Sequence, residues 1–331
     1  MDSCRPLVSI CIPTCNSARY LRETLESIAV QTWPRLEVII GDNASSDGTL
    51  AIADAYAVSH GWQVLRSDVN RGAFGNWNRL IETASGDYVA LYHSDDVYLP
   101  TIVEDSVMLL ERESAVGLVS TLATVIDGSG QERYAITLPL GVEPKRAYCF
   151  AEVFRAVLGC GGDRIFLVTP SVMVRRRLYA ELGLFDMSGR FGSSGDYEMW
   201  LRIAARYPVA IIPRPLMRYR IHEGQGSETE LRRNLAVPDI VAVLEQYAGL
   251  IDDPLLLGEY VRFLDKTYLK TALKQNCGGE YDRSSRTAGL IRPGRYWLPA
   301  VAIKLVNQLH CNLRYWPGRP WPCHLSLEEA P

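Results

Sequence analysis

The amino-terminal third of the chain alternates strand-like and helix-like segments. Apolar runs of strand length lie at 7–12, 36–40, 64–66 and 88–92. Between these runs, apolar residues recur at helical spacing, at 21–30, 49–59 and 74–84. Such alternation is typical of a mainly parallel sheet that helices cover on both faces. The sequence therefore predicts an α/β fold for this part of the chain.

The length and composition are those of a folded globular protein. The chain has 331 residues, of which 47% are hydrophobic and 22% charged, which argues against both a disordered chain and a membrane-spanning one. A chain of this length is expected to form two domains, or one large domain with an extension. The net charge of −3 argues against nucleic acid as a partner.

Short polar segments follow the predicted strands. In parallel sheets ligands bind beyond the carboxyl ends of the strands, so these segments are the expected binding site. They lie at 13–16, 42–47, 70–72 and 93–96. None of them contains the glycine pattern of a dinucleotide site or of a P-loop, which disfavours a dehydrogenase and a P-loop enzyme. Their small, polar and charged residues suit a nucleotide diphosphate and its metal.

The run at 88–92 ends in His93, Ser94 and two adjacent carboxylates, Asp95 and Asp96. Ionised carboxylates at the end of a buried strand are costly unless a cation neutralises them, and a divalent metal with oxygen ligands would do so. The alternative is a loop or a helix cap, because a helical pattern follows shortly afterwards. The motif alone leaves both interpretations open.

Two further positions are candidates for chemistry. Asp196 follows the glycine-containing stretch 192–195 and opens a helical pattern over 197–203. It is either a helix N-cap or a general base that takes a proton from an acceptor hydroxyl. His222 follows an alternating, strand-like run at 216–221. It is either a surface or hydrogen-bonding residue, or a group that holds the metal or the leaving diphosphate.

Five segments, taken in order, resemble the motifs of family 2 glycosyltransferases. They are Val8–Asn16, Val38–Thr49, Asn70–Gly72, Asp95–Asp96 and Asp196–Arg202. The resemblance implies a GT-A domain over 1–226, in which helices flank a mainly parallel sheet. It leaves 227–331 unmatched, where a helical extension is expected that contacts the acceptor or a membrane surface.

The resemblance implies an inverting transfer of a sugar from a nucleotide diphosphate sugar to an acceptor hydroxyl. Asp196 is then the catalytic base. Asp96 is expected to bind Mg²⁺ or Mn²⁺, which stabilises the charge that develops on the diphosphate. Asp95 reaches the ribose or a metal-bound water. His222 and His93 are further candidate metal ligands.

The other matched positions are expected to bind the nucleotide. Pro13 and Thr14 lie against the nucleoside, and the Asp42 carboxylate accepts a hydrogen bond from the base. The Arg71 guanidinium pairs with a phosphate. The complete predicted donor site is Pro13, Thr14, Asn16, Asp42, Arg71, Asn78 and Asp95.

Two positions depart from the family pattern. His93 stands where the family commonly has an acidic residue, so affinity for a hard cation is expected to fall. Its imidazole can ligate a softer metal, bond to the donor or pack. Gly195 stands where an acidic residue often precedes the base.

His93 motivates a second hypothesis, an inactive nucleotide-binding scaffold. A sugar nucleotidyltransferase is disfavoured, because 13–16 lacks the glycine- and arginine-rich phosphate loop of that class.

The carboxy-terminal fifth of the chain is basic. Residues 259–324 hold 11 Lys and Arg against 4 Asp and Glu, with Trp297, Trp316 and Trp321 among them. The segment is either a solvated helical pack or a surface that attaches to an anionic membrane. The apolar run 298–306 is too short to span a bilayer.

Further expectations concern the middle of the chain and its location. A loop or hairpin is predicted over 127–146, an uninterrupted helical stretch over 230–276 and one further helix over 296–309. Eight cysteines without a CxxC pair, and no secretory leader, predict reduced thiols and a cytoplasmic protein. If the basic segment attaches to a membrane, the location is its inner face. The expected acceptor is a glycan or a lipid-linked one, as in the synthesis of bacterial surface polysaccharide.

Overall fold

The computed structural model describes residues 5–160, 164–223 and 235–315. The chain divides into two compact units, Met1–Glu223 and Gly224–Pro331. The first unit contains the sheet and the predicted motifs, and the second is helical.

The first unit is built on one mixed sheet. In the described part of the chain its order is β3-β2-β1-β4-β8-β6-β9-β5, and β7 pairs with β6. The strands are β1 Val8–Thr14, β2 Leu36–Asp42, β3 Gln63–Leu65, β4 Tyr88–Leu91, β5 Val97–Tyr98, β6 Leu118–Asp127, β7 Glu132–Ala135, β8 Met173–Arg175 and β9 Val209–Ile221. The predicted α/β class is confirmed, and the segment at 127–146 contains the second strand of a β6–β7 hairpin.

The two halves of the sheet differ in direction. Strands β1 to β4 are parallel, and Thr14 at the end of β1 pairs with Asp42 at the end of β2. In the other half, β8 runs antiparallel to β4 and β6, while β9 runs antiparallel to β5. Because β5 directly follows Asp96, this last pairing brings the end of β9, with Arg220 and His222, to the turn after β4.

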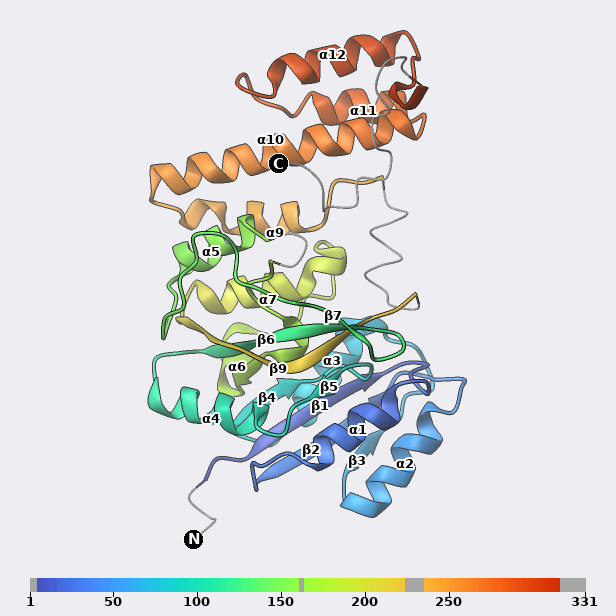
Figure 1. Ribbon diagram of the computed structural model, residues 1–331, viewed down its shortest axis with the longest axis vertical. Coiled ribbons are helices and arrows are strands. Elements are labelled where there is room, and N and C mark those ends of the chain that lie inside the picture. The colour runs from blue at the N-terminus through green and yellow to red at the C-terminus, as the bar shows by residue number, and fades with distance from the viewer. Residues whose placement is uncertain (1–4, 161–163, 224–234, 316–331) are drawn as a thin grey trace. The chain divides into compact units, whose positions relative to one another are not determined.

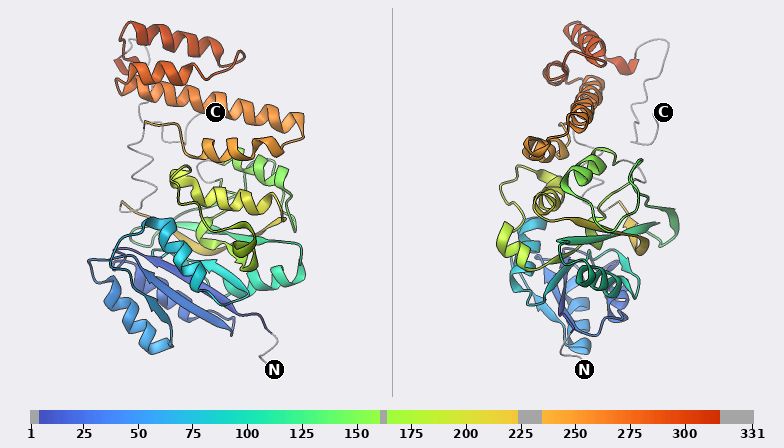
Figure 2. Two further views of the ribbon diagram at one scale, coloured as in Figure 1. Left: turned by 180° about the vertical axis from the view of Figure 1, so that it is seen from behind. Right: turned by 90° about the vertical axis from the view of Figure 1, so that its left-hand side faces the viewer.

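Helices cover both faces of the sheet. Figure 1 shows α1 in front of β1 and β2, and Figure 2, seen from behind, shows α3 in front of them. The helices of the first unit are α1 Leu21–Ala29, α2 Thr49–His60, α3 Gly72–Thr83, α4 Ile102–Arg112, α5 Phe150–Leu158, α6 Arg177–Leu182 and α7 Gly195–Ala204. Short 3₁₀ turns lie at Thr169–Ser171 and Gly192–Ser194.

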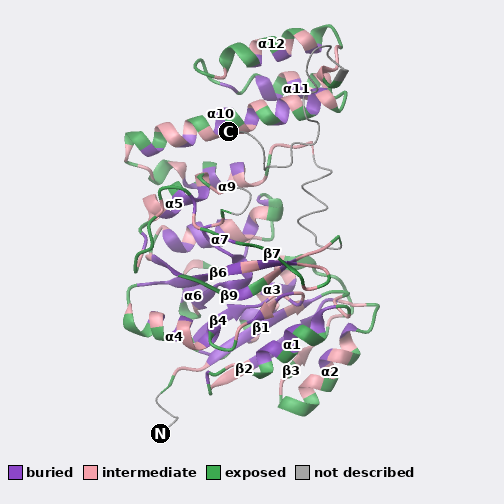
Figure 3. Ribbon diagram, in the orientation of Figure 1, coloured by how far each residue is buried: buried purple, intermediate pink, exposed green. Residues whose placement is uncertain are grey.

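The sheet is the centre of the core. Neighbouring residues of β1, such as Ile10 and Cys11, are both fully buried, as expected of a strand covered on both faces. All four residues of β4 are buried too, and Figure 3 shows the central strands in the colour of buried residues. Strand β4 is therefore a fixed support for the turn that follows it.

The second unit is a set of helices. Its elements in the described part are α9 Ile240–Tyr247, the 3₁₀ turn Ala248–Leu250, α10 Pro254–Cys277, α11 Tyr281–Ala288, α12 Trp297–Gln308 and the 3₁₀ turn Leu313–Tyr315. Helix α11 was not predicted, because its sequence holds few apolar residues. No helix in this part of the chain, or elsewhere among the described residues, is long and apolar enough to cross a membrane.

The prediction of one helical stretch over 230–276 is wrong at 235–239 and at 251–253. Asp253 accepts a hydrogen bond from the backbone N–H of Leu255 (2.9 Å) and caps α10, and Pro254 is its first residue. A capping aspartate followed by proline starts a new helix rather than continuing the previous one. Residues 230–234 lie outside the described residues.

Candidate active site

The loops after β1 and β2 hold each other in place. The backbone N–H of Asn16 donates to Ser45 Oγ (2.9 Å), and Asn16 Oδ1 accepts from the backbone N–H of Ser46 (2.9 Å). Thr14 is buried, and its hydroxyl donates to the Gly41 carbonyl (3.3 Å). The predicted donor residues Thr14 and Asn16 thus lie together at the carboxyl edge of the sheet, where Asn16 also closes a loop.

Asp42 ends β2 and is almost fully buried. Its Oδ2 accepts from the backbone N–H of Ser45 (3.2 Å), whereas Oδ1 is buried with no partner among the described residues. Such an atom costs free energy unless a ligand supplies a donor. Pro13 is half-buried on β1, in register with Gly41 beside it. Asp42 Oδ1 is therefore available to an N–H group of a ligand.

The loop before α3 is fastened by Asn43. Its Nδ2 donates to Asn70 Oδ1 (3.0 Å) and to the Gly72 carbonyl (3.2 Å), and its Oδ1 accepts from the backbone N–H of Arg71 (2.8 Å). These bonds fix the backbone of Arg71, whose exposed guanidinium donates to Ser67 Oγ (3.2 Å). Asn43 was missed as a site residue, although its place directly after Asp42 could have indicated it.

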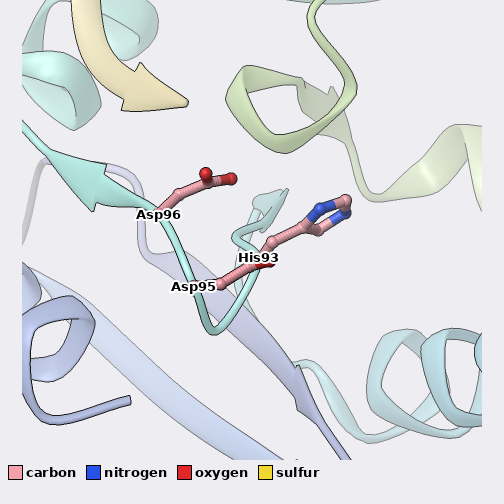
Figure 4. Close-up of side chains that lie close together, drawn as sticks. All are labelled: His93, Asp95 and Asp96. Carbon is pink, nitrogen blue, oxygen red and sulfur yellow. The ribbon is translucent and has the colours of Figure 1, made fainter. Parts of the chain in front are cut away.

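His93, Asp95 and Asp96 form a cluster on the short turn after β4, as Figure 4 shows. One ligand atom from each lies within 4.8 Å of the others. Asp96 Oδ2 and His93 Nε2 are buried, and neither has a hydrogen-bond partner in the described chain. The structure thus brings together three predicted site residues, and it leaves two ligand atoms unsatisfied.

Burial governs protonation in this cluster. It raises the pKa of Asp96 well above its usual value, and the charge of Asp95 adds to this effect, against the hydrogen bond and charge of Arg220. Burial also lowers the pKa of His93, although the charge of Asp95 opposes this effect. The lowered pKa favours the neutral imidazole. A bound cation would favour the ionised form of Asp96 and could accept the neutral imidazole as a ligand. The chemistry of these residues fits a divalent cation.

Asp95 behaves differently from its neighbour. Burial alone would raise its pKa, but the hydrogen bond from His222 and the charges of His93 and His222 bring it below the usual value. His222 Nε2 lies 3.1 Å from Asp95 Oδ2, and the His222 ring packs on Tyr20 with 4.8 Å between ring centroids. His222 therefore orients Asp95, and its role as a metal ligand stays a prediction.

Arg220, near the end of β9, was missed in the sequence. It is buried, its backbone N–H donates to Asp96 Oδ1 (2.8 Å) and its Nε donates to the Asp95 carbonyl (2.8 Å). Its terminal nitrogen pairs with Glu23 on α1 (2.6 Å). In an alternating strand, an arginine resembles any exposed residue, so only the pairing of β5 with β9 reveals this contact. Arg220 fixes the turn that carries the cluster.

Asp196 lies in the first turn of α7, and its side chain does not cap the helix. Its Oδ2 accepts from Thr169 Oγ1 (2.7 Å) and its Oδ1 from the backbone N–H of Tyr197 (2.8 Å). Burial raises the pKa of Asp196, against these hydrogen bonds. A carboxylate whose pKa is moved toward the working pH is a stronger proton acceptor. The geometry excludes the N-cap interpretation and suits a general base.

A pocket of about 130 Å³ links Arg71 with the start of α7, and its lining includes Phe74, Gly192 and Gly195. A Cβ on Gly195 would lie 2.6 Å from the Phe74 ring, a distance that packed atoms do not reach. The Phe74 ring is itself stacked on Phe185. This close approach explains why glycine stands directly before Asp196.

Asn78 of α3 is tied to the protein backbone. Its Nδ2 donates to the Phe185 carbonyl, and its Oδ1 accepts from the Phe185 N–H, both at 2.9 Å. The amide thus fastens α3 to the segment that leads to the pocket. Its predicted contact with the donor stays a prediction.

Comparisons with known proteins identify the class. Residues 9–182 match the family described as Glycosyl transferase family 2. A glycosyltransferase of Rickettsia typhi, itself uncharacterised, is 27% identical over 255 residues, which cover 74% of this chain and 70% of that protein. The chain is thus a glycosyltransferase. It belongs to glycosyltransferase family 2, as its motifs predict.

Two solved structures share the fold. TarS 1-349 of S. aureus has a TM-score of 0.59 at 16% identity and covers 91% of this chain and 88% of its own. The mannosyltransferase PcManGT from Pyrobaculum calidifontis, in complex with GDP-Man and Mn²⁺, has a TM-score of 0.59 at 19% identity and covers 95% and 82%. The predicted GT-A fold with a helical carboxy-terminal region is confirmed.

Proposed function

We propose that the protein transfers a sugar, with inversion, from a nucleotide diphosphate sugar to an acceptor hydroxyl, and that a divalent cation binds at the cluster of His93, Asp95 and Asp96. The supporting observation is the pair of buried, unpartnered ligand atoms, Asp96 Oδ2 and His93 Nε2. Buried polar atoms are rarely left without partners. Mg²⁺ or Mn²⁺ held there would neutralise charge on the leaving diphosphate.

The proposed donor site lies at the carboxyl edge of β1, β2 and β4. Asp42 Oδ1 accepts an N–H of the base, and Pro13 and Thr14 lie against the nucleoside. Arg71, which lines the pocket, binds a phosphate. Two structures that share the fold support a donor of this chemistry, since TarS was solved with UDP-GlcNAc and PcManGT with GDP-Man and Mn²⁺.

Asp196 is the proposed catalytic base. Its carboxylate takes the proton of the acceptor hydroxyl as that oxygen attacks the anomeric carbon, while the bond from this carbon to the diphosphate breaks. The bonds from Thr169 Oγ1 and Tyr197 N hold the carboxylate in one orientation. A single displacement of this kind inverts the configuration at the anomeric carbon.

We place the acceptor among glycans and lipid-linked glycans of bacterial surface polysaccharide synthesis, with transfer on the cytoplasmic side of the membrane. The support is the family of the chain and its basic carboxy-terminal segment. This assignment is separate from the donor chemistry and depends on different residues.

The test is a thermal-shift and hydrolysis screen of UDP, GDP and dTDP sugars with and without Mn²⁺. We expect one nucleotide class to raise the melting temperature when Mn²⁺ is present, and its sugar to be released slowly by water. A nucleotide that binds while every sugar stays intact would indicate the inactive scaffold instead. Binding of no nucleotide under any condition would overturn the proposal.

A further inference from the structure

Helix α12, together with Leu309 directly after it, exposes three leucines. Leu298, Leu305 and Leu309 are 71%, 56% and 75% exposed, and they recur at the spacing of one helix face. Figure 3 shows much of this helix in the colour of exposed residues. The opposite, buried face carries only Ala300, Ile303 and Asn307. An amphipathic helix that packs on its own protein has the reverse arrangement.

The inward face of α12 is fixed by polar contacts. Asn307 Oδ1 accepts from Asn276 Nδ2 on α10 (2.7 Å), and Asn307 Nδ2 donates to Ser284 Oγ on α11 (2.9 Å). All three residues are buried. Turning the helix to bury its leucines would leave these amides without partners, which costs free energy. The outward leucines are therefore a stable property of this helical unit.

The charged residues of the sequence segment that contains this helix are all basic. From Arg283 to Arg314 there are six Lys and Arg and no Asp or Glu. Arg286, Arg292, Arg295 and Arg314 are exposed. Trp297, at the first position of α12, is 46% exposed, and tryptophan is enriched where a bilayer meets water.

We propose that the outward face of α12 docks on the surface of a bilayer with anionic headgroups. The leucines enter the boundary between headgroups and acyl chains, and the arginines bind the headgroups. The helix, Trp297–Gln308, has 12 residues and is too short to span a bilayer, so it lies in the plane of the surface. Trp316 and Trp321, which the sequence also suggested for this role, lie outside the described residues.

Charge favours a bilayer over a second copy of the chain as the partner. Two copies that met through this face would bring two sets of arginines together with no acidic residue in the same segment to balance them. Like charges that approach each other in this way oppose association. Anionic lipids provide the complementary charge. This inference does not depend on the proposed donor site.

The test is co-sedimentation of the full chain with vesicles of phosphatidylcholine, alone or mixed with phosphatidylglycerol. We expect binding to the mixed vesicles only, and weaker binding at high salt. Leu305→Glu with Leu309→Glu should reduce binding by more than about tenfold. The matched control is Val58→Glu with Met108→Glu, which changes two exposed apolar helix residues of the first unit and should leave binding unchanged.

Replacement of two exposed arginines tests the contribution of positive charge to vesicle binding. Replacing Arg292 and Arg295 by serine should weaken binding to the anionic vesicles by about fivefold for each residue. Since all the altered side chains are exposed, the melting temperature should stay close to that of the parent chain. Equal binding to both kinds of vesicle, or unchanged binding of the Leu305→Glu, Leu309→Glu variant, would overturn the proposal. A third result would also overturn the proposal: the parent chain binds no vesicles but forms a dimer in analytical ultracentrifugation, and the Leu305→Glu, Leu309→Glu variant does not form that dimer.

Discussion

Two carboxylate centres in the first unit are built on different plans. On the turn after β4, Asp96 Oδ2 and His93 Nε2 are buried and lack partners in the described part of the chain. At the start of α7, both oxygens of Asp196 accept hydrogen bonds, from Thr169 and from the backbone of Tyr197. Buried polar atoms are normally paired. The first centre is therefore incomplete in the protein alone, whereas the hydrogen bonds of the second are already made.

This difference suits two separate roles for the centres, one in binding and one in proton transfer. In the proposed function, the first centre gains its partners only when donor and cation bind, so it would control affinity. A centre that is already satisfied holds its carboxylate in the same orientation before and after binding, so it controls the proton transfer. Changes at the two centres should separate binding from turnover.

The largest difference between the effect on turnover and the effect on donor binding is expected at Asp196. We predict that Asp196→Asn lowers turnover by about 10² to 10⁴-fold, the usual scale for loss of a general base, with donor binding largely kept. The asparagine oxygen can still accept the bond from Thr169, so the local structure is preserved. Steady-state kinetics and nucleotide titration measure the two quantities. Near-normal turnover would remove Asp196 from the role of base.

Arg220 tests how the incomplete centre is positioned. Arg220→Lys keeps the buried charge but cannot reproduce the fork that joins Asp95 and Glu23. We predict that metal-dependent nucleotide affinity falls about 10- to 100-fold, the scale for residues that orient metal ligands. Arg218→Lys, at an exposed arginine of the same strand, is the matched control. Equal affinities for the two variants would contradict the positioning role.

The pH dependence of turnover tests the completed centre. Burial raises the pKa of Asp196, and only its ionised form accepts a proton. Turnover at saturating donor and cation should therefore fall as the pH is lowered through a pKa above that of an ordinary aspartate, about 3.9. The residual activity of Asp196→Asn should lack this acidic limb. If turnover of that variant still falls at the same acidic pH, the titrating group is not Asp196.

The smallest effect is expected at Asn78 of α3, which binds the Phe185 backbone. Asn78→Ala removes two hydrogen bonds to the Phe185 backbone and should lower the free energy of unfolding by about 1–3 kcal/mol. Nucleotide affinity should stay unchanged. Thr83→Ala, which removes a bond within the same helix, provides the comparison for stability. A loss of affinity with unchanged stability would support the donor contact that the sequence predicts.

Local sequence patterns predicted the parallel half of the sheet well. The periodicity around β1, β2 and β4 is local, and it correctly placed Thr14, Asp42 and the carboxylate pair at one edge. These elements could be predicted because the apolar pattern of each one and the residues that end it lie within a few positions of each other in the sequence.

The remainder depends on pairing between distant segments. The contact of Arg220 with Asp96 spans 124 positions and arises only because β9 returns antiparallel to β5. No local pattern encodes that pairing. The same holds for Asn78, whose partner lies 107 positions away, and for the outward leucines of α12, where the apolar spacing predicted a helix but not the face that packs.

The most direct test is calorimetric titration of UDP and of GDP, with and without Mn²⁺, into the parent chain and the Asp96→Asn variant. The asparagine can still accept the bond from the Arg220 backbone but loses the charge that a cation requires. We predict that Mn²⁺ strengthens binding of one nucleotide to the parent chain by at least about tenfold and leaves the variant unaffected. The same strengthening in both proteins would show that the cluster after β4 does not bind the cation.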